Sequence, residues 1–354
     1  MANPLIVAKN AILIVILIIL AILFFLAYLV AYVTSIFSRR ARLIWIEYLK
    51  TCYTLPIIEV AAMTSPATVK IYSTSPGMKF EVVNNQLRSV MCPRSVLISN
   101  HQIYCDWIYL WWLAYTAECH PGICIMLKDT LGKIPLFGWI MHCFEFMFIT
   151  RSWENDEKVM KKRTAEMNKN RNDPLWLLMF PEGTVYNRET HDRTLKYADK
   201  ANIPKNLIPE HMLLPRYKGL QTILTGLHSS VKVLYDITMV YAPVSPTGEP
   251  AETYYSLVKT FFKSEGAPLV QMHIREFAVK DIPYQDEQAF EKWMIKTFKE
   301  KDDIYAKLMN NELEHELRAE APMKIKSKWH LYSSINIPLT VIISARLLYK
   351  YLTR

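Results

Sequence analysis

The stretch SVLISNHQIYCDWIYLWWLAY, residues 95–115, decides the fold. Its first six residues, 95–100, are mostly apolar and form a run short enough to predict a buried strand. From Trp107 to Tyr115 aromatic and apolar residues recur at helical spacing, which predicts a helix. The polar residues between the two, beginning at His101, then lie on a turn that joins a strand to a helix. Such a unit is typical of an α/β domain.

Similar patterns continue along the chain. Further apolar runs predict strands at Gly122–Leu127, Glu145–Thr150, Leu175–Phe180, Leu234–Tyr241 and Leu269–Phe277. Helices are predicted from Pro135 through Met141 and over 154–163. A long helical tail rich in charged residues is predicted over Glu287–Arg318. Because strand and helix patterns alternate, we expect an α/β fold in which helices flank a mixed central sheet.

Composition narrows the class of partner. The 354 residues are 51% hydrophobic and carry a formal net charge of +9. This balance excludes a disordered chain and allows one large domain with appendages. A basic surplus favours an anionic partner, which can be nucleic acid, a membrane surface or a phosphorylated substrate. No nucleic-acid-binding module is present, so we expect no nucleic acid partner.

The six cysteines form no CxxC pair. Cys119, His120 and Cys124 are close in sequence, but no second pair of ligands follows at zinc spacing. We therefore expect reduced, mostly buried thiols and no metal site.

An uncharged apolar segment lies near the N-terminus, at residues 10–38. It is longer than the roughly 20 residues that span a bilayer, and too long for the apolar core of a signal peptide. It predicts an uncleaved transmembrane helix, since a soluble helix of this kind would need protein on every side. Arg39, Arg40 and Arg42 follow it, against Lys9 before it, which places the remainder of the chain in the cytosol.

A second apolar stretch, Leu331–Ala345, lies near the C-terminus and is flanked by basic residues. Asn336 and Pro338 interrupt it, so it predicts either a span or a helix in the membrane interface. The expected domains are an N-terminal anchor (1–42), a catalytic α/β domain (43–285), a helical tail (286–330) and a C-terminal hydrophobic and basic membrane segment (331–354).

His101 and Asp106 form the first candidate for chemistry. Two residues five apart on one regular helix diverge by roughly 140°. They meet only if His101 lies on the turn and Asp106 in the first helical turn, as predicted here. A neutral imidazole can take the proton of a hydroxyl, and a carboxylate on its other nitrogen fixes the tautomer. Alone, this spacing is common by chance, and a structural histidine near a helix start is the better explanation of it.

A second candidate is FPEGT, residues 180–184, which follows the apolar run LWLLM. A turn at a strand end exposes backbone N–H groups, Gly183 permits a left-handed backbone, and Thr184 adds a hydroxyl donor. Such a turn can cradle a phosphate or a glycerol. Glu182 would repel a phosphate, so we expect it to bond an acceptor hydroxyl or to brace the amides of its own loop.

Together the two motifs resemble the blocks of the glycerophospholipid acyltransferase family, also called PlsC-like. FITR ends in Arg151, where that family places an arginine for the acceptor's phosphate. LLPRYKG (213–219) and TMVYAPV (238–244) match its later blocks, and the resemblance covers residues 94–244 in the family's order. NHQIYCDW, LKDTLGKIPLFGW and ITRSWENDE resemble the lysocardiolipin and lysophosphatidylinositol acyltransferase branch, which includes fungal members of the endoplasmic reticulum.

The resemblance implies that a fatty acyl chain moves from acyl-CoA to a hydroxyl of a lysophospholipid, without an acyl-enzyme. Lysophosphatidylinositol, lysophosphatidic acid and lysocardiolipin are the implied acceptor types. No cofactor or metal is implied, since acyl-CoA is a co-substrate. The implied location is the endoplasmic reticulum membrane with the catalytic domain in the cytosol; a lipid droplet or mitochondrial membrane is the alternative.

The resemblance also distributes roles among residues. It makes His101 the base and Asp106 its orienting carboxylate. The implied acceptor-binding residues are Arg151, Glu182, Gly183, Thr184 and Arg216. Lys128 and Lys133 either reach the CoA phosphates or are ordinary solvated lysines. A CoA-independent transacylase and a catalytically inactive lipid-binding protein of the membrane remain as rival functions.

Overall fold

The computed structural model describes residues 38–169, 171, 173–244 and 248–328, together with isolated positions nearer the two termini. The predicted transmembrane helix at 10–38 and the predicted membrane segment at 331–345 fall almost entirely outside these residues. In the described ranges, no helix combines the length and apolarity that a bilayer crossing requires.

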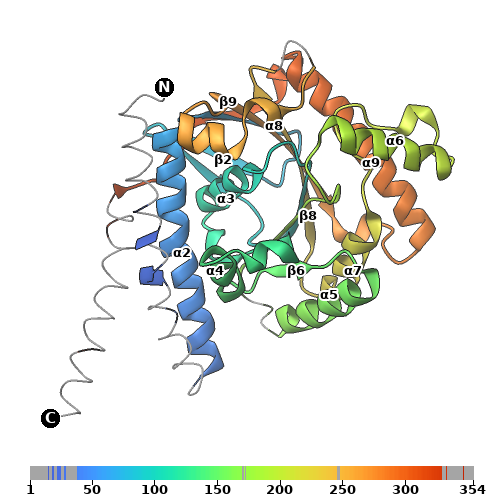
Figure 1. The fold of residues 1–354 in the computed structure, drawn as a ribbon. Helices are drawn as coiled ribbons and strands as arrows, with labels where there is room; N and C mark the ends of the chain where they lie inside the picture. The colour runs from blue at the N-terminus through green and yellow to red at the C-terminus, as the bar shows by residue number, and fades with distance from the viewer. Residues whose placement is uncertain are drawn as a thin grey trace.

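A mixed sheet of eight strands forms the centre of the domain, in the order β10-β1-β9-β8-β4-β7-β5-β6 (Figure 1). The strands from β8 to β6 in this order run parallel, whereas β9 is antiparallel to β8 and β10 is antiparallel to β1. The strands are β1 (Thr68–Tyr72), β4 (Arg94–Ser99), β5 (Ile123–Lys128), β6 (Met147–Ile149), β7 (Leu175–Met179), β8 (Val233–Ala242), β9 (Leu269–Ala278) and β10 (Leu317–Pro322). A separate hairpin consists of β2 (Lys79–Val83) and β3 (Gln86–Val90). The α/β class and the mixed central sheet are therefore as predicted.

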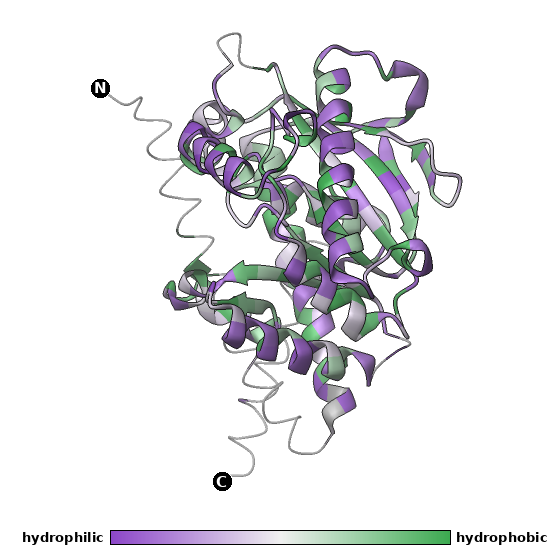
Figure 2. Cartoon of the chain, turned by 90° about the vertical axis from the view of Figure 1, so that its right-hand side faces the viewer, coloured by the Kyte–Doolittle hydropathy of each residue, from purple (hydrophilic) through white to green (hydrophobic). Residues whose placement is uncertain are grey.

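Helices cover both faces of this sheet. The α-helices are α2 (Arg39–Thr64), α3 (Asp106–Thr116), α4 (Phe137–Cys143), α5 (Trp153–Asn168), α6 (Arg188–Lys200), α7 (Tyr217–Leu227), α8 (Ala251–Tyr254) and α9 (Glu287–Met309). In Figure 1 the layer with α2, α3 and α4 lies on one side of the strands, and α5, α7 and α9 lie on the other. Seen from the second side, the helices nearest the viewer carry long runs of hydrophilic residues (Figure 2).

Alternation along each strand fills the two cores. Leu97 of β4 joins the core under α2 and α3, whereas Val96 and Ile98 join the core under α5, α7 and α9. All six residues of β4 are buried. A central parallel strand is covered on both faces, which explains why its three middle residues, 96–98, are all apolar.

The helix predicted over 287–318 is too long. Helix α9 ends at Met309, and Asn311 has a left-handed backbone with φ of 55°. The chain then forms β10, whose alternating burial places Arg318 and Glu320 outward and Ala319 and Ala321 inward. Beyond α9, residues 310–313 of the predicted helix form a turn, 314–316 form a short 3-10 helix, and only Leu317 and Arg318 belong to β10, an edge strand of the central sheet. Smaller differences affect α4, which begins two residues after Pro135, and β6, which is shorter than predicted.

Candidate active site

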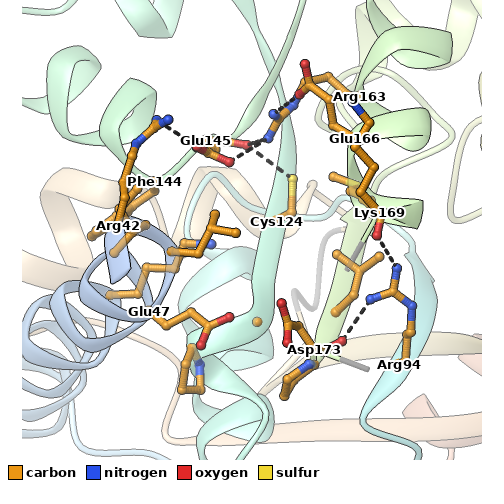
Figure 3. A pocket seen from close by; sticks show the side chains of 18 residues that line it. Arg42, Glu47, Arg94, Cys124, Phe144, Glu145, Arg163, Glu166, Lys169 and Asp173 are labelled. Atoms are coloured by element: carbon orange, nitrogen blue, oxygen red, sulfur yellow. Dashed lines mark hydrogen bonds and ion pairs between the residues drawn. The ribbon is translucent and has the colours of Figure 1, made fainter. Parts of the chain in front are cut away.

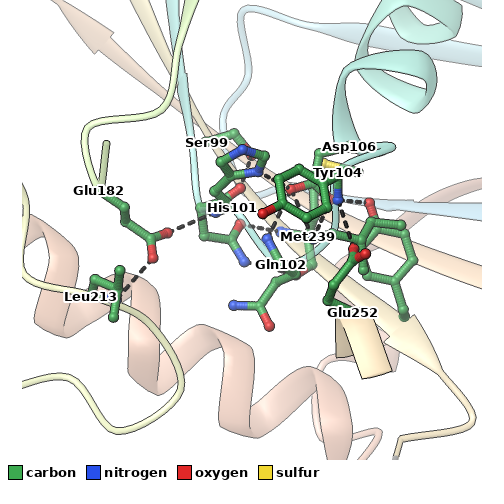
Figure 4. A network of polar contacts seen from close by, with 12 residues as sticks. Ser99, His101, Gln102, Tyr104, Asp106, Glu182, Leu213, Met239 and Glu252 are labelled. Atoms are coloured by element: carbon green, nitrogen blue, oxygen red, sulfur yellow. Dashed lines mark hydrogen bonds and ion pairs between the residues drawn. The ribbon is translucent and has the colours of Figure 1, made fainter. Parts of the chain in front are cut away.

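His101 and Asp106 meet as the spacing requires. His101 lies on the turn after β4, Asp106 is the first residue of α3, and His101 Nδ1 is 2.8 Å from Asp106 Oδ2 (Figure 4). The Asp106 side chain is fully buried, whereas that of His101 is 18% exposed. An ionised carboxylate only accepts hydrogen bonds, so Nδ1 carries the proton and Nε2 is left with its lone pair. The geometry is that of an oriented general base.

Several donors surround the Asp106 carboxylate. Oδ2 also accepts the backbone N–H of Gln102 at 2.8 Å and that of Ile103 at 3.3 Å. Oδ1 accepts the hydroxyl of Tyr241, which comes from β8. Asp106 additionally lies at the N-terminus of α3, where the helix dipole favours negative charge. Four donors therefore fix the position and orientation of this buried carboxylate.

The FPEGT turn supports His101 from the other side. The Phe180 ring stacks on the imidazole with 4.2 Å between ring centroids and 19° between planes. Glu182 Oε1 accepts the backbone N–H of His101 at 2.7 Å, and Oε2 accepts that of Leu213 at 2.9 Å. Burial raises the pKa of Glu182 to about 8.

Glu182 thus has a bracing role, but not the one expected. Only 2% of the residue is exposed, and both oxygens bind amides of neighbouring loops rather than of its own. The alternative expectation, a bond to an acceptor hydroxyl, is not what this buried geometry provides. The carboxyl instead joins the loops before α3 and α7.

Two arginines converge at Gly183. The glycine has φ of 73°, as expected for a left-handed turn, and its carbonyl oxygen accepts Arg151 Nη2 at 2.7 Å. The Arg216 side chain also lies close to Gly183, since a Cβ added to this glycine would lie 3.4 Å from Arg216 Nε. Neither guanidinium forms an ion pair within the described ranges. The two arginines therefore place unpaired positive charge beside the turn, as a phosphate site requires.

The Arg151 side chain can reach Gly183 because a different residue, Asp156, holds the Arg151 backbone. Asp156 accepts the N–H of Thr150 at 2.7 Å and that of Arg151 at 2.8 Å. Glu154 and Asp156 are close to Arg151 in sequence and could each form a surface ion pair with its side chain. In the structure Asp156 binds the backbone instead, which leaves the guanidinium for Gly183.

The remaining predicted residues stand apart. Thr184 is half-buried beside the turn. Lys128 is exposed at the end of β5, and Lys133 forms an ion pair of 2.8 Å with Asp129 while its side chain stays 74% exposed. No hydrogen bond joins either lysine to His101 or to the FPEGT turn within the described ranges. Their proposed contact with CoA stays a prediction.

Sequence reasoning missed three contributors to the site. Tyr241 and Phe180 lie inside quoted motifs, but nothing in the sequence indicates that they contact Asp106 and His101. Glu252, from α8, accepts the backbone N–H of Tyr104 at 2.8 Å, and the Tyr104 ring stands edge-on to His101 with 6.4 Å between centroids. More than 140 residues separate Glu252 from Tyr104, so no local pattern could pair them.

The cysteines agree with the prediction of reduced thiols. All six are free, and five of them are buried. The described residues contain no group of three or more side chains placed to hold a metal ion.

A polar cavity of about 380 Å³ lies elsewhere, between α2 and α5 (Figure 3). It opens where β4, β5 and β7 begin, whereas His101 follows the end of β4. Arg42 binds Glu145 at 2.8 Å, and Arg163 binds Glu166 at 2.6 Å. Glu145 pairs with Arg42 of α2 and, at 3.6 Å, with Arg163 of α5, so it joins the two helices at the edge of the sheet opposite the candidate active site.

Comparison with known proteins agrees with this site. A family model described as acyltransferase matches residues 79–247, which include His101, Asp106, the FPEGT turn and both arginines. An acyltransferase of Schizosaccharomyces pombe is 34% identical over 264 residues, covering 74% of this chain and 73% of that protein. The chain belongs to the acyltransferase family. Glu252 and the whole of α9 lie beyond the part that the acyltransferase model matches.

Other acyltransferases carry names that specify a substrate. The 2-acyl-1-lysophosphatidylinositol acyltransferase of Saccharomyces cerevisiae is 31% identical over 298 residues, covering 74% of each chain. Lysocardiolipin acyltransferase 1 of Danio rerio is 30% identical over 267 residues, covering 74% of this chain and 61% of that one. The crystal structure of the 1-acyl-sn-glycerophosphate acyltransferase PlsC from Thermotoga maritima covers 81% of this chain and 95% of its own, at 12% identity and a TM-score of 0.37.

Proposed function

We propose that this acyltransferase moves a fatty acyl chain from acyl-CoA to a free hydroxyl of a lysophospholipid at the endoplasmic reticulum membrane. The names of the relatives, which specify lysophosphatidylinositol and lysocardiolipin, support the class of acceptor. The observation that carries the proposal is the oriented His101 with the Arg151 and Arg216 guanidiniums nearby. A base and an anion site side by side suit an acceptor that has both a hydroxyl and a phosphate.

The acceptor's phosphate lies between the two arginines, because a guanidinium can hold two phosphate oxygens at once. This anchors the molecule at the FPEGT turn and directs its hydroxyl to His101 Nε2. Phe180 limits rotation of the imidazole by stacking on it. Holding hydroxyl and base together removes much of the entropic cost of the reaction.

His101 Nε2 then takes the hydroxyl proton while the oxygen attacks the thioester carbon. The imidazolium that forms is stabilised by Asp106 through Nδ1. When the tetrahedral intermediate collapses, the carbon–sulfur bond breaks and His101 returns its proton to the thiolate of CoA. The acyl chain never bonds to the protein, so His101 is neutral again after each cycle.

The test is turnover by the purified protein with labelled acyl-CoA and a panel of lysophospholipids. His101→Ala should lose at least the roughly 10²–10⁴-fold that a general base contributes. His228→Ala is the matched control, because His228 is exposed at the end of α7. Product formed without acyl-CoA from a phospholipid donor would replace the proposal with a transacylase. Wild-type turnover in His101→Ala would refute the mechanism.

A further inference from the structure

Four apolar side chains are exposed within seven residues between β5 and α4. The exposed fractions are 37% for Leu131, 42% for Ile134, 41% for Leu136 and 39% for Phe137. We call these four residues the apolar rim. Single exposed apolar residues are ordinary on a protein surface, but a contiguous group of this kind marks an interaction surface.

The backbone keeps the rim exposed. Leu136 has a left-handed backbone with φ of 64°, which is uncommon for a residue with a branched apolar side chain. Gly138 packs so closely that an added Cβ would lie 2.2 Å from the carbonyl oxygen of Gly132. This close packing joins the start of α4 to the preceding turn, so the rim cannot fold inward without breaking it.

The rim lies at the same edge of the sheet as the proposed site. β5 runs parallel to its neighbours β7 and β6, and the carboxyl ends of parallel strands meet at one edge. β7 leads into the FPEGT turn, β6 leads to Arg151, and β5 leads directly into the rim. The turn before α4 packs against β6, since an added Cβ at Gly132 would lie 2.9 Å from the Phe148 ring. The rim therefore flanks the entrance for the acceptor.

The other neighbour of the rim is the predicted transmembrane segment. The Tyr28 ring contacts Trp139 of α4 with 5.7 Å between centroids, and Phe24 contacts Phe144 at 5.0 Å. Farther toward the N-terminus, Val15, Ile18, Ile19 and Ile22 are 42–53% exposed at the spacing of one helix face. The helix that begins with Phe137 of the rim therefore packs against part of a segment of bilayer-spanning length.

We propose that the apolar rim inserts into the interfacial region of a lipid bilayer. Insertion places the Arg151 and Arg216 end of the site at the membrane, where a lysophospholipid keeps its tail among other lipids while its head group enters. Lys128 precedes the rim and Lys133 lies between Leu131 and Ile134, and both favour anionic head groups. The inference rests on the proposed lipid acceptor, but its first test needs no turnover.

The first test measures insertion with a fluorophore that responds to its environment. The probe is attached at Phe137→Cys in the full chain, reconstituted into vesicles of phosphatidylcholine and phosphatidylserine that contain nitroxide-labelled acyl chains. Val82→Cys on the β2–β3 hairpin is the matched control, because Val82 is 43% exposed. We expect the nitroxides to quench the probe at 137 and not the probe at 82. Equal quenching at the two sites, or none at 137, would overturn the proposal.

The second test compares acceptors. Leu131→Ser, Ile134→Ser and Phe137→Ser together should lower turnover of a long-chain lysophospholipid in vesicles by about tenfold or more. Turnover of a short-chain lysophospholipid dissolved as a monomer should change by less than about twofold, since the rim contacts no reacting group. Val82→Ser, Val83→Ser and Val90→Ser remove comparable exposed apolar surface from the hairpin and should leave both activities intact.

The outcomes separate this inference from the proposed function. Equal losses on both acceptors would mean that the substitutions damage the domain, and would overturn the rim's membrane role. Self-association of the full chain in detergent that the triple serine variant abolishes would assign the rim to a second copy instead. If the probe at 137 is quenched but the protein acylates no lysophospholipid, the membrane insertion of the apolar rim stands and the proposed reaction is refuted.

Discussion

Replacing Asp106 by asparagine tests how the base is held. The two carboxylate oxygens have different neighbours: Oδ2 faces the N–H groups of His101 and Gln102, whereas Oδ1 faces the Tyr241 hydroxyl. An amide nitrogen in place of Oδ2 would oppose two donors. In place of Oδ1 it would meet a hydroxyl, which can rotate and accept. We therefore expect the carboxamide oxygen to remain on His101 Nδ1.

This orientation sets the size of the effect. The tautomer of His101 is preserved, and what is lost is the charge that stabilises the imidazolium. A hydrogen bond to a charged group contributes about 1.5–3 kcal/mol, against about 0.5–1.5 for a neutral one. A difference of about 1–2 kcal/mol corresponds to roughly five- to thirtyfold in rate. A reversed carboxamide would instead enforce the wrong tautomer, for which a loss of about 10⁴ is the precedent in serine proteases.

The assay is kcat with saturating acyl-CoA and lysophospholipid, in Asp106→Asn and in Asp106→Asn combined with Tyr241→Phe. Removing the Tyr241 hydroxyl takes away the acceptor that orients the amide. The double variant should therefore lose more activity than the combined losses of Asp106→Asn alone and Tyr241→Phe alone. Turnover of Asp106→Asn within twofold of wild type would refute the role of Asp106. An effect confined to the KM for acyl-CoA would make Asp106 a substrate-binding residue.

Three further predictions concern Arg151, Glu182 and the side of the membrane on which the domain lies. Arg151→Lys should raise the KM for the lysophospholipid more than that for acyl-CoA, and Arg151→Ala should raise it further, because lysine lacks the two-point contact of a guanidinium; a rise for acyl-CoA alone would assign Arg151 to the donor. Glu182→Gln should lower the free energy of unfolding by about 1–3 kcal/mol in denaturant titration, because one of the two amide N–H groups it binds loses its acceptor. If Arg39, Arg40 and Arg42 face the cytosol, protease added to intact microsomes should cleave within the exposed α6, and complete protection in sealed vesicles would place the domain in the lumen.

Local patterns predicted five strands of the central sheet and the helices α3, α4 and α5, together with the start of α9. β4, β5, β7, β8 and β9 were all visible as apolar runs, because strands covered on both faces need apolar residues throughout. The contact between His101 and Asp106 was also predictable, since both belong to one strand–turn–helix unit. In each case the information lies within about a dozen neighbouring residues.

Long-range features were not predictable in this way. Strand β10 was not predicted, and the predicted helix ran past the end of α9 into its first two residues, because an edge strand with charged outward residues has no apolar run. The direction of Glu182 depends on where the loops carrying His101 and Leu213 come to lie, and the partner of Tyr241 depends on the adjacency of β4 and β8. These contacts are set by the order of strands in the sheet, which local spacing does not encode.

The position of β1 in the sheet has a consequence for how the protein is made. Both neighbours of this strand, β9 and β10, come from the last part of the chain, with β10 beginning 245 residues after β1 ends (317 − 72). At roughly 5–20 residues per second, β1 leaves the ribosome about 12–50 s before its second partner is synthesised. Until β9 is made, TVKIY has unpaired backbone groups on both sides, and one side stays unpaired until β10 is made, an arrangement that promotes association between chains. Nascent chains halted before residue 317 should therefore depend on chaperones to remain soluble, and that dependence should end once β10 has emerged.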